Sequence, residues 1–192
     1  MKRIILILLT IIPVASQANI EVDGSYISYE GNKLNLDTSL FRIQKMLGEP
    51  YDYKTFDGYT YYTWYKGEGS ASLAVTLDDQ DQVESMTLSG MPFSGSYAVV
   101  NGSKHSLNET LGQIRKNADY GCYMDQGWNE GYEIRSFDVR TGPEGSVAAS
   151  FSTLLRVGDP VSNESVFQNA KLTSFTLEYE IGAGGQEIDC KY

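Results

Sequence analysis

The chain has few of the side chains that hydrolytic and metal-dependent chemistry require. Its 192 residues contain one histidine, His105, and two cysteines, Cys122 and Cys190. A hydrolase needs a base beside its nucleophile, but we expect His105 to lie in a solvated polar loop, and no G-x-S-x-G elbow is present. One imidazole and two thiols also make a poor zinc site. We therefore expect no enzyme, no catalytic residue, no metal and no cofactor.

Long apolar runs are absent except at the N-terminus. Lys2 and Arg3 precede an apolar segment, Ile4–Val14, and small residues follow at Ser16 and Ala18. About 11 apolar residues are too few to cross a bilayer, which needs roughly 20. The pattern predicts a secretory signal peptide over 1–18 and a periplasmic or secreted protein of the bacterial envelope. No cysteine stands directly after the cleavage site, so we do not expect a lipoprotein. No later segment is apolar enough to span a bilayer, so we expect no membrane insertion.

Basic residues are in the minority. The chain has 15 lysines and arginines against 25 aspartates and glutamates, a net charge of −10. Loss of residues 1–18 removes two basic residues and no acidic ones, which brings the charge to −12. Such a charge repels nucleic acid and anionic membranes and favours a basic protein partner. Acidity that serves only solubility is the alternative interpretation.

The two cysteines predict one structural disulfide. An even number of cysteines in an oxidising compartment is normally paired. A Cys122–Cys190 bridge closes a loop of 69 residues, and the chain-entropy model gives such a loop a stabilisation of roughly 4 kcal/mol.

An internal repeat suggests how the chain is organised. Leu40 and Tyr61 recur 71 residues later as Leu111 and Tyr132. Each copy begins with a short amphipathic segment, after which alternating apolar and polar residues predict strands. These strands are expected near 59–66, 71–77 and 82–89, and near 131–140, 146–153 and 171–181. The predicted fold class is α+β, a tandem repeat of a short helix packed on a three- to four-stranded antiparallel sheet.

The repeat also sets the expected domains and the expected exposed face. The first helix-plus-sheet unit spans 19–90, a connector spans 91–104, and the second unit with a C-terminal hairpin spans 105–192. Because Tyr61 has an equivalent in Tyr132, we assign Tyr61 to the core face. Tyr62 and Trp64 then project from the opposite, small-residue face, where exposed rings favour protein binding. The predicted partner-binding residues are Tyr62, Trp64, Glu133, Arg135 and Phe137. The alternative is that these rings are buried.

Two short motifs give a family resemblance over most of 30–181. A helix ending in Leu47-Gly48-Glu49-Pro50, followed by an aromatic strand and the turn 77–83, resembles one unit of the secreted β-lactamase inhibitor proteins and of the BamE-like (SmpA/OmlA) envelope lipoproteins. The tandem arrangement is more similar to the inhibitors, which grip an enzyme with a concave aromatic surface. The lipidated cysteine of the lipoproteins is absent here. The inhibitors usually have one disulfide in each repeat, whereas this chain has one cysteine pair.

Together these features favour a binding protein. We expect an exported periplasmic protein that inhibits or neutralises a basic enzyme, as an inhibitor or as an immunity protein against a toxin. The alternative is a soluble accessory protein of cell-envelope assembly or maintenance.

Overall fold

The structure is a computed structural model that describes residues 18–21, 25–65, 67, 71–89, 96–129, 132–141, 146–156, 168–179 and 186–191. Of the predicted signal peptide, only Ala18 lies within the described residues, and its side chain is buried. No described helix has the length and apolar character needed to span a membrane.

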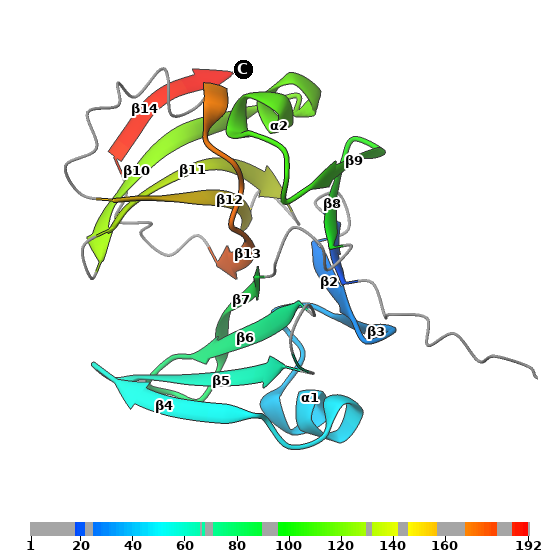
Figure 1. Ribbon diagram of the computed structural model, residues 1–192. Coiled ribbons are helices and arrows are strands. Elements are labelled where there is room, and N and C mark those ends of the chain that lie inside the picture. The colour runs from blue at the N-terminus through cyan, green and yellow to red at the C-terminus, as the bar shows by residue number, and fades with distance from the viewer. Residues whose placement is uncertain are drawn as a thin grey trace, which may run out of the picture.

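Nearly half of the described residues form a single large antiparallel sheet. Its strands are β4 (Asp52–Phe56), β5 (Tyr59–Tyr65), β6 (Ser72–Leu77), β7 (Val83–Ser89), β10 (Gly121–Asn129), β11 (Tyr132–Thr141), β12 (Val147–Arg156), β13 (Ser174–Tyr179) and β14 (Gln186–Lys191). The nine strands follow the order β14-β10-β11-β12-β13-β7-β6-β5-β4. In Figure 1 they succeed one another from β14 at the top to β4 at the bottom.

A smaller sheet and two helices complete the fold. The sheet contains β1 (Asn19–Glu21), β2 (Tyr26–Tyr29), β3 (Asn32–Leu34), β8 (Tyr97–Val100) and β9 (Ser103–Ser106). Its order is β3-β2-β1-β8-β9, with β1 and β8 parallel. The helices are α1 (Leu40–Leu47) and α2 (Leu111–Asn117). The helices and the small sheet lie on the right of the large sheet in Figure 1.

Local sequence explains where the helices begin and end. Ser39 is the N-cap of α1, and Gly48 ends the helix with a φ of 82°, a left-handed conformation that suits glycine. Helix α2 starts with a capping box, in which the backbone N–H of Thr110 donates to the side chain of Gln113 at 2.8 Å. At its other end, the Lys191 ammonium donates to the carbonyl oxygens of Arg115 and Ala118.

One face of the large sheet forms the core. Leu73, Val75 and Leu77 of β6 and Met86 and Leu88 of β7 are buried, as the alternation in these strands predicts. They belong to the same buried cluster as residues of both helices and of the small sheet. The opposite side chains of these strands form what we call the outer face.

The predicted α+β fold class is wrong. The described chain is mostly β, with fourteen strands and two short helices. The two expected sheets are not separate layers with one helix each, because β7 pairs with β13 and joins them into one sheet. The expected connector 91–104 also contributes β8 and the start of β9. Leu40 and Leu111 both occupy the first position of a helix. However, α1 follows three strands (β1, β2 and β3), whereas α2 follows two (β8 and β9) and precedes five (β10 to β14).

Candidate partner-binding face

The structure places Tyr62 and Trp64 on the core face and not on the outer face. Tyr62 pairs with Val75, and Trp64 pairs with Leu73, so these rings share a face with the buried residues of β6. Trp64 is 4% exposed, and its indole Nε1–H donates to the carbonyl oxygen of Gly48 at 3.0 Å. The predicted exposure is therefore wrong for Trp64, for which the alternative, burial, is correct, and Tyr62 is partly buried against the core.

The predicted residues of the second half also lie on the core side. Phe137 is fully buried and packs edge-on against Tyr123, with ring centroids 5.3 Å apart. The Arg135 guanidinium is held by Asp125 at 2.8 Å and Glu133 at 2.9 Å. Four strands separate β11 from β5, which is a distance of roughly 24 Å at the usual strand spacing. The structure therefore does not bring the five predicted residues together.

The aromatic residues that are exposed on the outer face belong to β5 and its hairpin with β4. Tyr61 pairs with Thr76, and Tyr65 pairs with Ser72, so both rings stand beside small side chains. Phe56 pairs with Tyr59 across the tight Asp57-Gly58 turn. Tyr51 packs edge-on against Tyr65 at a centroid distance of 6.0 Å. Tyr51 lies just before β4 and adjoins the outer-face rings only through this contact with Tyr65. We call Tyr51, Phe56, Tyr59, Tyr61 and Tyr65 the aromatic patch.

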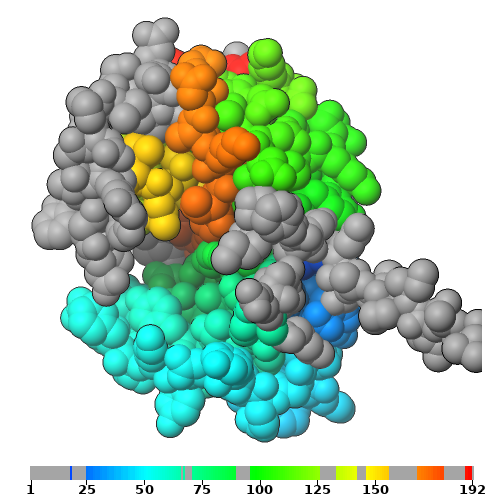
Figure 2. Space-filling model, viewed as in Figure 1, coloured from blue at the N-terminus to red at the C-terminus, as the bar shows by residue number. Residues whose placement is uncertain are grey.

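The aromatic patch is accessible to a partner. Tyr51 and Phe56 are 75% and 74% exposed, and Tyr61 is 37% exposed. The segment that contains α1, β4 and β5, coloured cyan, forms one end of the molecule, opposite the end that contains α2 (Figure 2). Beyond Tyr61 the outer face carries small hydroxyl residues, among them Thr87 and Thr176, whose hydroxyl oxygens lie 3.1 Å apart.

Carboxylates border the aromatic patch on the outer face. A register shift between β6 and β7 places Glu84 near Tyr61. Burial raises the pKa of Tyr61, and the negative charge of Glu84 raises it further. Burial also raises the pKa of Glu178 to about 7, with added repulsion from Asp138 and Glu84. Burial is the larger cause of both shifts, and the smaller electrostatic part shows that Glu84, Glu178 and Asp138 lie near one another on the outer face.

Glu178 should make the fold less stable as the pH rises. Its folded pKa of about 7 lies above the ordinary value of 4.5 for a glutamate, so the folded state binds the proton more tightly than the unfolded state. The free energy of unfolding should therefore fall as the pH increases from about 4.5 to about 7, by up to roughly 3 kcal/mol from this group. Denaturant unfolding at pH 5 and pH 8 measures the effect.

The Glu178→Gln variant isolates this contribution. Glutamine is neutral at both pH values, so the variant should lose stability less steeply than the wild type between pH 5 and pH 8. Glu49→Gln, at an exposed position, is the matched control and should keep the wild-type slope. Parallel pH profiles for the wild type and Glu178→Gln would contradict the raised pKa.

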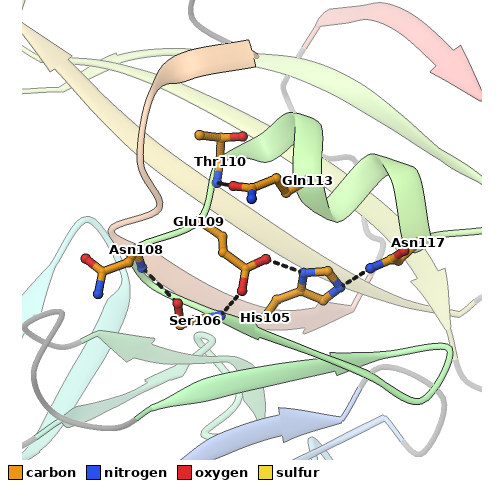
Figure 3. Close-up of polar contacts among 7 residues, drawn as sticks. All are labelled: His105, Ser106, Asn108, Glu109, Thr110, Gln113 and Asn117. Atoms are coloured by element: carbon orange, nitrogen blue, oxygen red, sulfur yellow. Dashed lines mark hydrogen bonds and ion pairs between the residues drawn. The ribbon is translucent and has the colours of Figure 1, made fainter.

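His105 is buried in a strand and does not lie in a solvated loop. It lies in β9 and is 2% exposed, so the expected exposure is wrong. Its Nδ1 lies 2.7 Å from Glu109 Oε2, and its Nε2 lies 3.1 Å from Asn117 Nδ2 (Figure 3). The other Glu109 oxygen accepts the backbone N–H of Ser106 at 2.9 Å. Both ring nitrogens thus connect β9 to the two ends of α2, and neither of these contacts is with a hydroxyl nucleophile.

Comparison with known proteins gives no further identification, because no family model, no curated protein and no solved structure matches the chain. The resemblance to the inhibitor and BamE-like proteins stays a prediction.

Proposed function

We propose that this chain is an exported binding protein that inhibits or neutralises a basic enzyme, and that the aromatic patch on the outer face is its contact surface. The observation that carries the proposal is the exposure of five aromatic rings on one hairpin and the adjoining strand end. Exposed aromatic rings grouped on one element in this way are typical of interaction sites in globular proteins. Tyrosine rings also supply contact area at a low cost in side-chain entropy.

The net acidity of the chain supports a basic partner. Glu84 and Glu178 lie close enough to interact electrostatically with each other, and Glu84 also interacts with Tyr61. The whole chain has a net charge of −10. A positively charged partner would be steered toward this surface, and its association would slow as the salt concentration rises. The Cys122–Cys190 disulfide is compatible with the proposed export.

Tyr61→Ala should weaken partner binding without unfolding the protein. A ring at the centre of an interface typically contributes about 2 kcal/mol or more, which is roughly a 30-fold change in affinity. The partner is first captured from an envelope extract with the mature chain, identified, and purified. Its affinity for the wild type and for each variant is then measured together with thermal unfolding.

A second exposed tyrosine serves as the matched control. Tyr120 lies outside the aromatic patch and is 49% exposed, so Tyr120→Ala should keep wild-type affinity. Equal affinities for Tyr61→Ala and the wild type would exclude the patch as the contact surface. Specific capture of an acidic envelope-assembly component would contradict the proposed function, because the chain would then act in assembly.

A further inference from the structure

A cavity lies next to the aromatic patch, at the end of β5. Its volume is about 360 Å³, within the usual size range of small-ligand sites. The described lining residues are Tyr29, Glu30, Asn32, Met46, Leu47, Glu49, Tyr51, Trp64 and Tyr65. They come from the β2–β3 hairpin, the C-terminal end of α1, and the β4–β5 region. Tyr51 and Tyr65 belong to both the patch and the cavity, so a partner that covers this end of the patch would also meet the mouth of the cavity, whose inner residues lie on the core side of the sheet.

The inner wall of the cavity is held in place by hydrogen bonds. The Tyr29 hydroxyl donates to the carbonyl oxygens of Trp64 at 3.2 Å and Ala71 at 3.1 Å. Trp64 in turn donates to Gly48 at 3.0 Å. Both rings are buried, so they are fixed before any ligand arrives. A preformed wall lowers the entropic cost of binding.

The rim of the cavity is aromatic and accessible. Tyr51 and Tyr65 meet at an interplanar angle of 77°, so their rings present surfaces in two directions. The face of an aromatic ring attracts cations, and arginine is the side chain most often found there. The tyrosines that line the cavity thus favour a positively charged planar group.

The charge of the lining favours the same ligand. Glu30 and Glu49 contribute two carboxyl groups, and no described lining residue is a lysine or arginine. The C-terminal end of α1 adds a partial negative charge. Met46 and Leu47 offer apolar surface against which the methylene groups of a long basic side chain can pack.

We infer that this cavity receives an arginine side chain of the basic partner. The inference rests on the proposed function and names the group that the partner inserts. The planar guanidinium can stack on a tyrosine ring while its N–H groups donate to the carboxylates of Glu30 and Glu49. A lysine ammonium offers neither the planar stacking nor the forked donor geometry.

Titration with a model compound tests the cavity directly. The probe is N-acetyl-arginine amide, and N-acetyl-citrulline amide is the uncharged control of nearly the same shape. Binding is followed by NMR through the indole N–H of Trp64, assigned by its loss in Trp64→Phe, and the methyl group of Met46. Saturable shifts are expected with the arginine compound, and the citrulline compound should bind at least about tenfold more weakly.

Two variants show whether the response comes from the cavity. Glu49→Gln and Glu30→Gln should each weaken arginine-amide binding, and Tyr120→Ala should leave it unchanged. Choline is titrated in parallel, because binding of choline as tight as that of the arginine compound would assign the cavity to small quaternary ammonium ligands and overturn the inference. Absence of saturable shifts, or equal shifts with the citrulline compound, would also overturn it.

The cavity and the proposed function can fail separately. If a basic enzyme is captured through Tyr61 but Glu49→Gln and Glu30→Gln keep wild-type affinity for it, the inference about the cavity is wrong and the proposed function stands. If the cavity binds the arginine compound but no basic enzyme is captured, the proposed function is wrong and the guanidinium site stands.

Discussion

Trp64→Ala should lower the free energy of unfolding by about 3–5 kcal/mol, the usual cost of truncating a buried aromatic side chain. The indole lies on the core face beside Leu73 and is 4% exposed. Its removal leaves a cavity and deprives the carbonyl oxygen of Gly48 of its hydrogen-bond donor. It also removes a ring that packs against Tyr62 at a centroid distance of 6.4 Å. Denaturant unfolding of the mature chain measures the loss.

Trp64→Phe separates packing from hydrogen bonding. Phenylalanine fills much of the same space but cannot donate to Gly48, so most of the packing is kept and the loss should be clearly smaller. A typical hydrogen bond contributes about 1 kcal/mol. A Trp64→Ala variant that unfolds like the wild type would show that the ring is exposed in solution, as the sequence pattern alone suggests.

The strands could be predicted from the sequence because alternation reports which residues share a face. Strands β6 and β7 lie within one residue of their expected bounds, and their apolar side chains are buried as expected. The alternation of apolar and polar residues does not indicate which other strand pairs with each edge of a strand. The pairing of β7 with β13 joins segments about 90 residues apart, and no short-range pattern in either strand indicates it. For this reason the continuous sheet and the fold class could not be predicted.

The face of β5 was predicted wrongly for a related reason. The strand has aromatic residues on both faces, so polarity alone does not distinguish them, and the assignment depended on matching Tyr61 to Tyr132. In the structure Tyr61 faces outward and Trp64 faces the core. One usable signal was the Asp57-Gly58 pair, which is typical of a two-residue hairpin turn. It predicts β4 and the pairing of Phe56 with Tyr59, and therefore an exposed aromatic hairpin at the sheet edge.

Reduction of the Cys122–Cys190 disulfide should lower the free energy of unfolding by about 4 kcal/mol, the loop-closure value for a loop of this length. The bridge joins two residues that are direct partners across β10 and β14. Strand β14 is the last strand of the large sheet, with β10 as its neighbour. Lys191 of this strand also donates to the C-terminal carbonyl groups of α2. Loss of the bridge should therefore loosen β14 and the end of α2 before the rest of the fold.

Three measurements test this prediction. Thiol counting under denaturing, non-reducing conditions should find no free cysteine in freshly purified protein. Hydrogen exchange after reduction should increase first at the amides of β14 and at the end of α2, while the amides of β6 and β7 stay protected. A Cys122→Ala/Cys190→Ala variant should match the reduced wild type in stability, because both lack only the cross-link. Two free thiols in the native protein, or reduction that leaves stability unchanged, would contradict a structural bridge.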